Sequence, residues 1–212
     1  MPGGSCGRLN GLGSDMPRVD AITQDSHLEA ARLLPAALIA DLRTDHAGES
    51  GAVMIYRGII AVTRDTSVRH FAQAHRTTEA GHLAQIEPLL APQQRSRLLP
   101  LWRIAGWLTG ALPALVGPRA VYATIEAVET FVDRHYAEQI ELIDRLDPRS
   151  DHLPLQALRD LLQTCRGDEI MHRDEATALF ALSGKPPSLA MRVWVGLVGA
   201  GSRAAVKICR RV

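Results

Sequence analysis

The stretches Glu79–His82 (EAGH) and Glu169–His172 (EIMH) repeat one short pattern, Glu-x-x-His, in two apolar helical segments of the chain. Positions i and i+3 project from the same face of a helix, so the two side chains of each pair can reach one metal ion. A further glutamate lies upstream of each copy, Glu49 in the first half and Glu129 in the second. Four inward glutamates and two histidines form the ligand set of a carboxylate-bridged di-iron centre in a helix bundle.

The spacing of these residues predicts that they lie at one level. A break at residues 64–67 follows Glu49 by about 16 residues and precedes the first Glu-x-x-His by about 15. At a rise of about 1.5 Å per residue, each of the two helical arms is roughly 24 Å long, so both ends return to the same level. In the second half the break at residues 147–151 lies about 20 residues after Glu129 and about 21 before the second copy. The six candidate metal ligands are therefore Glu49, Glu79, His82, Glu129, Glu169 and His172.

The residue types suit this chemistry. Carboxylates bridge cations, imidazole binds iron, and four carboxylates neutralise two divalent ions. Without metal, four carboxylates on apolar helix faces would be costly to bury. One Glu-x-x-His alone is a weak pattern that usually marks a solvated helix face, so the two registered copies carry the prediction.

Composition favours one helical domain. The chain has 212 residues, 46% hydrophobic and only 4% aromatic, which suits packed helices. Lys plus Arg is 24 against 23 for Asp plus Glu, and this balance argues against nucleic acid as a partner. Three widely spaced cysteines, Cys6, Cys165 and Cys209, form no disulfide framework and favour a reducing compartment. We expect a flexible tail over residues 1–28 and one domain over 29–212.

Apolar periodicity predicts an all-α, ferritin-like four-helix bundle with an apolar crossover helix and an amphipathic C-terminal helix. The expected helices span about 34–63, 68–90, 98–117, 118–146, 153–182 and 188–210. The crossover, 98–117, is interrupted by Pro100, Arg103 and Pro113, so we expect it to lie on or dip into a membrane without crossing it. Four basic residues of the last helix would then face anionic headgroups: Arg203, Lys207, Arg210 and Arg211. A dimer interface or a buried sixth helix are the alternatives.

Flanking residues bring a resemblance to a known family. Asp45–Val53 (DHAGESGAV) closely resembles the first motif of the demethoxyubiquinone hydroxylases of ubiquinone biosynthesis, and residues 98–117 look like that family's crossover. The segments around Glu129 and Asp168–His172 (DEIMH) resemble its third and fourth motifs. Two departures remove no ligand: Thr77–His82 lacks the charged residues usual in the second motif, and Thr130 follows Glu129 where a second glutamate is common.

The resemblance implies a di-iron monooxygenase, with two iron ions per chain held by the six candidate ligands. It implies hydroxylation of a polyprenyl quinone by dioxygen, with NADH as the electron donor. Asp45 or Asp168 would hydrogen-bond a ligand histidine, with an ordinary aspartate of the helix surface as the alternative for either. Tyr136 would contact the quinone or relay an electron, with a plain core tyrosine as the alternative. His46 and His135 lie off the ligand stripe and are expected at the surface or beside the ligands, while His75 is expected to be a hydrogen-bonded histidine of the bundle.

The resemblance also implies peripheral attachment to the cytoplasmic face of a bacterial inner membrane, or to the matrix side of the mitochondrial inner membrane in a eukaryote. The oligomeric state stays open, with a homo-oligomer or contacts to other ubiquinone-biosynthesis proteins among the options. Two other functions stay open as well: a ferritin- or rubrerythrin-like protein that oxidises iron or reduces peroxide, and a non-catalytic membrane-surface scaffold.

Overall fold

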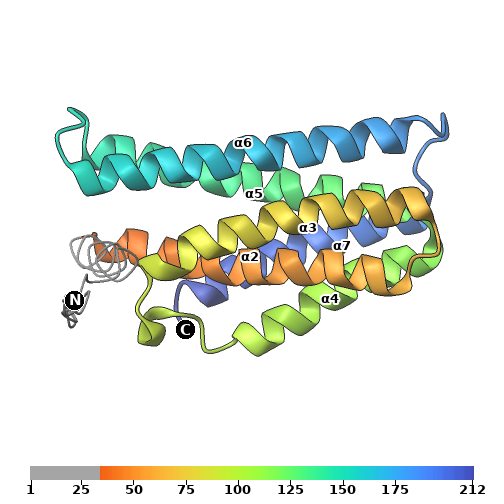
Figure 1. Ribbon diagram of the computed structural model, residues 1–212, viewed down its shortest axis with the longest axis horizontal. Helices are drawn as coiled ribbons and strands as arrows, with labels where there is room; N and C mark the ends of the chain where they lie inside the picture. The colour runs from red at the N-terminus through yellow and green to blue at the C-terminus, as the bar shows by residue number, and fades with distance from the viewer. Residues whose placement is uncertain (1–33) are drawn as a thin grey trace, which may run out of the picture.

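The computed structural model describes residues 34–212, which form six α-helices and no strand (Figure 1). The helices are α2 (Ala36–Val62), α3 (Thr66–Ile86), α4 (Leu99–Val116), α5 (Pro118–Leu146), α6 (Leu153–Ala181) and α7 (Leu189–Cys209). The expected all-α, ferritin-like architecture is confirmed. The tail predicted for residues 1–28 lies outside the described residues, so its boundary with the domain stays a prediction.

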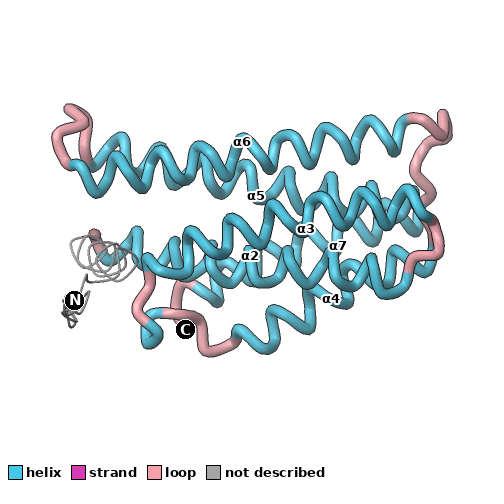
Figure 2. Tube along the Cα trace, viewed as in Figure 1, coloured by secondary structure: helices cyan, strands magenta, loops and turns pink. Residues whose placement is uncertain are grey.

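The helix ends follow local chemistry. The Asp65 side chain accepts a hydrogen bond from the backbone nitrogen of Val68 at 3.0 Å and so caps α3. At the other end α3 stops at Ile86, earlier than the expected Leu90, because Pro88 cannot donate to a continuing helix. Residues 87–98 form the longest connection, with two 3₁₀ turns, and lead into α4 (Figure 2).

Two apolar clusters lie on either side of the candidate ligands along the bundle. One contains Ile55, Phe71 and Ile125, and the other contains Leu42 and Ile140 among its members. In each of the four helices α2, α3, α5 and α6, the candidate glutamate falls between residues of the two clusters in sequence. The polar layer is therefore enclosed by packed apolar side chains at both ends.

The crossover helix α4 lies directly against α2. A Cβ atom on Gly106 would collide with the carbonyl oxygen of Gly51, and one on Gly110 would collide with that of Ile55. Gly58 of α2 is equally close to the backbone at Trp107. Glycine is thus required at these crossings, because the two helix backbones touch without an intervening layer of side chains.

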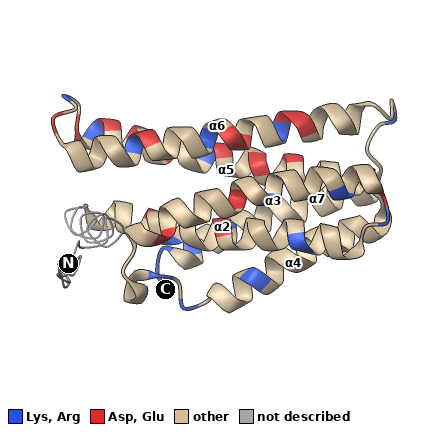
Figure 3. Ribbon diagram, viewed as in Figure 1, with Lys and Arg blue, Asp and Glu red and all other residues tan. Residues whose placement is uncertain are grey.

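The outer surface of α4 and part of α7 is apolar. Within α4 the residues are Leu101, Ile104, Leu108, Leu112, Leu115 and Val116, each at least 43% exposed. Leu189, Val193 and Leu197 are exposed apolar residues of α7. Figure 3 shows that charges concentrate on α5 and α6. The sequence of α4 contains one charged residue, Arg103. By length and composition alone, α4 and α7 are each apolar enough to cross a membrane.

An ion pair and a backbone hydrogen bond hold the C-terminal end of α7 against the rest of the structure. Nε of Arg210 lies 2.6 Å from Oδ1 of Asp41 on α2, and the backbone nitrogen of Arg97 donates to the carbonyl oxygen of Val212. Near its start, Trp194 donates from its indole nitrogen to Thr124 of α5 at 2.9 Å. Arg210 was expected to face lipid headgroups; its guanidinium pairs with a buried aspartate while its side chain stays 42% exposed, so its role at a membrane stays a prediction.

Candidate metal centre

Four helices bring the six candidate ligands together. One ligand atom from each of Glu49, Glu79, His82 and Glu169 fits within a single group whose atoms lie within 4.8 Å of one another. A second such group contains Glu79, Glu129, Glu169 and His172. Glu79 and Glu169 belong to both groups, so the two groups lie side by side and have these carboxylates in common.

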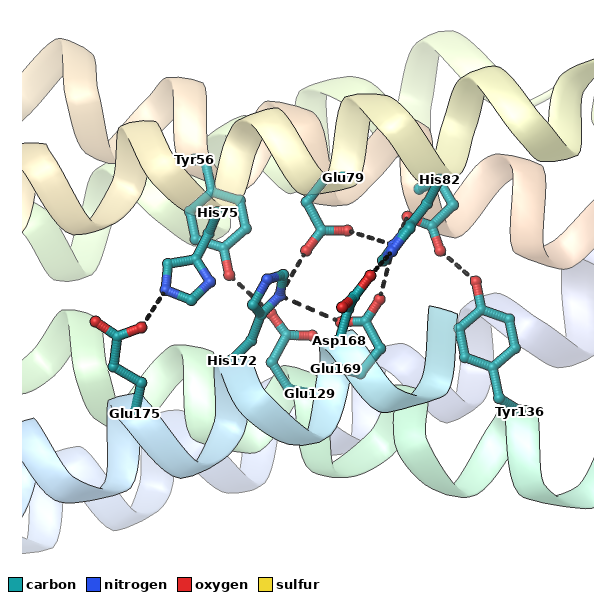
Figure 4. Close-up of polar contacts among 11 residues, drawn as sticks. Tyr56, His75, Glu79, His82, Glu129, Tyr136, Asp168, Glu169, His172 and Glu175 are labelled. Atoms are coloured by element: carbon teal, nitrogen blue, oxygen red, sulfur yellow. Dashed lines mark hydrogen bonds and ion pairs between the residues drawn. The ribbon is translucent and has the colours of Figure 1, made fainter. Parts of the chain in front are cut away.

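The two histidines enter the cluster in the same way, through Nδ1 (Figure 4). Nδ1 of His82 lies 3.2 Å from Oε1 of Glu169, and Nδ1 of His172 lies 3.1 Å from Oε1 of Glu79. Each histidine on one half of the chain thus faces the Glu-x-x-His glutamate of the other half. This crossed arrangement joins α3 to α6 through the centre.

The donor atoms are buried and short of hydrogen bonds. Every one of the six side chains is at most 5% exposed. Nδ1 of both histidines, both carboxylate oxygens of Glu169 and one each of Glu49 and Glu79 have no hydrogen-bond partner. Unpaired buried polar atoms are rare and costly, and cations coordinated by these atoms would satisfy them. The donor set of oxygen and imidazole nitrogen therefore fits a pair of iron ions.

The pKa values of several candidate ligands are strongly shifted, as expected for a buried cluster of charged groups. Burial raises the pKa of Glu49 and of Glu129 well above the usual carboxyl range. Burial also opposes ionisation of Glu79, but its interactions with His172 and His82 outweigh that effect and lower its pKa to about 2. For His172, burial favours the neutral ring, yet the carboxylates of Glu169 and Glu79 raise its pKa to about 9. Without metal, protons on the histidines balance the carboxylates.

An outer carboxylate supports one histidine. Nε2 of His82 lies 3.0 Å from Oδ2 of Asp168, an arrangement that orients the ring and leaves Nδ1 directed at the glutamates. Asp45 does not perform the matching role that the sequence allowed. It lies 3.1 Å from Nε2 of His135 and accepts a hydrogen bond from Gln139 at 2.8 Å, so it supports a different histidine.

An apolar cavity of about 430 Å³, lined in part by α4 and α7, reaches the cluster. All four glutamates line it, whereas neither His82 nor His172 does. Its walls come from α2, α4, α5 and α7 and include Ile55, Trp102, Phe131, Trp194 and Leu197. The arrangement offers an apolar molecule direct access to the carboxylate side of the centre.

Comparison with known proteins identifies the relatives of this chain. The family profile described as "Ubiquinone biosynthesis protein COQ7" matches residues 36–209. The chain belongs to the COQ7 family. The resemblance inferred from residues 45–53 and the flanks of the candidate ligands is thereby confirmed.

Individual proteins similar to this chain are named as hydroxylases of ubiquinone precursors. The chain is 40% identical over 182 residues to a 3-demethoxyubiquinol 3-hydroxylase of Rhodospirillum rubrum, covering 84% of this chain and 80% of the relative. It is 33% identical over 178 residues to the NADPH-dependent 3-demethoxyubiquinone 3-hydroxylase, mitochondrial, of Mus musculus, covering 83% and 78%. The human protein of the same name is 32% identical over 179 residues, covering 84% and 79%.

Tyr136, for which the sequence suggested either a functional role or a plain core position, lies beside the ligand cluster. It is 1% exposed, lines the cavity, and donates its hydroxyl hydrogen to Oε1 of Glu49. The sequence interpretation missed its counterpart Tyr56, which donates to Oε1 of Glu129 at 2.9 Å. A signal was present, because Tyr56 follows Glu49 by seven residues just as Tyr136 follows Glu129.

Three other singled-out histidines are buried. His75 is hydrogen-bonded, as expected, with Nε2 lying 2.9 Å from Oε2 of Glu175, and its ring centroid is 4.0 Å from that of His172. His46 and His135 are 1% and 7% exposed, so the surface position considered for them is wrong. His135 pairs with Asp45 as described, and His46 lies 3.6 Å from Glu87.

Proposed function

We propose that this chain hydroxylates the ring of a polyprenylated demethoxybenzoquinol in ubiquinone biosynthesis, using dioxygen. The observation that carries the proposal is the apolar cavity whose inner end is formed by the four glutamates of a metal-binding cluster. Membership of the COQ7 family supports it, since the relatives above are named as hydroxylases of such a quinone. The same features argue against iron storage, which needs no apolar cavity.

In this proposal two iron ions would be held by Glu49, Glu79, His82, Glu129, Glu169 and His172. The two groups of ligand atoms, which have Glu79 and Glu169 in common, support this set of residues. When bound, the iron pair would supply the activation of dioxygen, with two electrons from the donor and two protons. One oxygen atom becomes the new hydroxyl group on the ring, and the other leaves as water.

The protein positions the substrate. The cavity walls hold the ring against the glutamates and keep water from the centre, with Trp102 and Trp194 fixed by hydrogen bonds to Ser96 and Thr124. Tyr136 stands beside Glu49 at the cavity wall, where its hydroxyl can contact the ring or pass an electron. On the far side, Asp168 holds the imidazole of His82 in one orientation.

Electrons would come from a reduced nicotinamide coenzyme. We predicted NADH, and the name of the mouse relative specifies NADPH for that protein. The polyprenyl tail would leave the cavity between α4 and α7, whose exposed apolar residues would rest in the membrane surface. In this proposal the protein would be attached peripherally to a quinone-containing membrane, and the bilayer would be the source of the substrate.

The decisive experiment supplies iron-loaded protein with a short-tailed demethoxyquinol, dioxygen and a reductant, and identifies the product by mass spectrometry. We expect a product heavier by one oxygen atom, with the atom derived from ¹⁸O₂. Metal analysis on the same sample separates the other functions. Two irons with no quinone product would favour an iron-oxidising or peroxidase protein, and no bound iron would favour the scaffold.

A further inference from the structure

The buried centre raises the question of how a divalent ion reaches it. The cavity on the α4 and α7 side has apolar walls, and a dication loses its hydration at large cost in such a passage. The ligand histidines His82 and His172 are not part of the cavity lining, whereas all four glutamates are. The surface of α3 and α6, the helices that carry these histidines, is therefore where a polar approach is expected.

Glu175 of α6 marks such an approach. Its side chain is 54% exposed, while its Oε2 lies 2.9 Å from Nε2 of His75 on α3. His75 itself is only 5% exposed, so a surface carboxylate and a buried imidazole are joined directly. Figure 4 shows the His75 ring between Glu175 and His172.

The second nitrogen of His75 is the independent observation. An ionised carboxylate only accepts hydrogen bonds, so Nε2 of His75 carries the hydrogen that Glu175 receives, and Nδ1 keeps a free lone pair. Nδ1 is buried and has no hydrogen-bond partner. The ring is 4.0 Å from that of His172, centroid to centroid, and stacks on Tyr56, whose hydroxyl binds Glu129. Nδ1 of His75 is therefore a nitrogen capable of binding metal that lies next to the ligand His172 without belonging to the ligand cluster.

We propose that Glu175 and His75 form an uptake site for ferrous iron, in which Glu175 captures the hydrated ion and Nδ1 of His75 receives it before His172 and the glutamates do. The proposal rests on the iron centre of the proposed function and adds a route to it. Carboxylate oxygen and imidazole nitrogen are both good donors for Fe²⁺, and an exposed acidic group raises the local concentration of cations.

The test follows the loading of metal-free protein with Fe²⁺ under argon, stopping the reaction with a chromophoric chelator and counting protein-bound iron. Glu175→Gln keeps a hydrogen-bond acceptor for His75 but removes the charge, and we expect the initial uptake rate to fall by about three- to tenfold. The final iron content should stay that of the unmodified protein, because Glu175 is outside the ligand cluster. Asp174→Asn is the matched control, since its side chain is 64% exposed and pairs with Arg173.

His75→Phe keeps an aromatic ring beside Tyr56 and His172 but removes the nitrogen. We expect it to slow uptake as well. Equal uptake rates for Glu175→Gln, Asp174→Asn and the unmodified protein would overturn the proposal. So would a His75→Phe variant that loads at the normal rate but binds iron more weakly at equilibrium, because that result would make His75 only a support for His172. If the unmodified protein itself binds no iron pair, the proposed function fails instead, and the two failures are distinct.

Discussion

The buried hydroxyl of Tyr56 on α2 donates a hydrogen bond to Oε1 of Glu129 on α5, at an oxygen-to-oxygen distance of 2.9 Å. The reciprocal contact exists too, because Tyr136 on α5 donates to Glu49 on α2. Each tyrosine follows one glutamate by seven residues in sequence and binds the other in space. Hydrogen bonds to Glu49 and Glu129, the two candidate ligands outside the Glu-x-x-His pairs, therefore join the two halves of the chain.

We predict that Tyr56→Phe lowers the free energy of unfolding of the metal-free protein by about 1–3 kcal/mol, because a buried carboxyl oxygen loses its donor. Denaturant unfolding measures the change. Tyr122→Phe is the control, since that ring packs edge-on against Phe71 outside the ligand cluster. Because Tyr136 also lines the cavity, Tyr136→Phe should reduce turnover in addition to stability. Equal stabilities for Tyr56→Phe and Tyr122→Phe would refute the structural role of the Tyr56 contact.

The overlap of the two ligand groups predicts unequal effects on iron content. Glu169 belongs to both groups, so Glu169→Ala should lose both ions, whereas Glu49→Ala should retain about one. Iron per chain after anaerobic loading and desalting is the measurement, with the exposed Glu138→Ala as control. Retention of full iron content and hydroxylation by Glu169→Ala would show that the site is assigned wrongly.

The metal-free protein should lose stability as pH rises. The pKa of His172 is about 9 in the folded protein, above its ordinary value of 6.5. Its contribution is therefore fully present below about pH 6.5 and is lost as pH rises through about 9. Urea unfolding at these two pH values should show a drop on the order of 1–3 kcal/mol, and His172→Gln should flatten it. No drop in the unmodified metal-free protein would contradict the ion pairs of His172 with Glu79 and Glu169.

Two glycines should respond in opposite directions to alanine. Nothing lies within 4 Å of a Cβ atom on Gly81, so Gly81→Ala should stabilise α3 by about 1 kcal/mol through helix propensity. Gly110→Ala should destabilise the protein, because the new methyl group would meet the carbonyl oxygen of Ile55. Thermal unfolding of both variants gives the signs, and a stabilised Gly110→Ala would refute the close packing of α4 on α2.

Acidic substitutions on α4 should weaken membrane attachment. Leu108 and Leu115 are 43% and 72% exposed, so replacing both by aspartate should leave folding intact and reduce sedimentation with anionic liposomes. Leu153→Asp is a control of similar chemistry at the start of α6, where the side chain is 75% exposed. If all three proteins bind liposomes equally, the α4 surface is not the membrane contact.

The helices and the ligand layer could be predicted because both depend on short-range spacing. Apolar periodicity and the breaks at Asp65 and Pro148 located the hairpins, and the hairpins set the level of each glutamate. The bounds differ from expectation by a few residues, chiefly at the end of α3, where Pro88 stops the helix sooner than expected.

The partners of the outer residues could not be predicted, because they depend on how helices rotate against one another. Asp168 pairs with His82, as the sequence allowed, but Asp45 faces α5 and pairs with His135 instead. Spacing along α7 placed Arg210 among the basic residues, yet only the packing of α7 on α2 brings it to Asp41. Tyr56 was visible on the ligand stripe, but its bond to Glu129 crosses between the two halves.

The cavity touches all four glutamates and neither ligand histidine, and this gives the centre two chemically different sides. An apolar substrate would reach the centre from the bilayer through the cavity, and a hydrated cation would reach it from water past Glu175 and His75. The two would not compete for one route. A molecule that lost its iron could then be refilled while still seated on the membrane, with its substrate channel in place. Maintenance and turnover would be separated by the geometry of a single bundle.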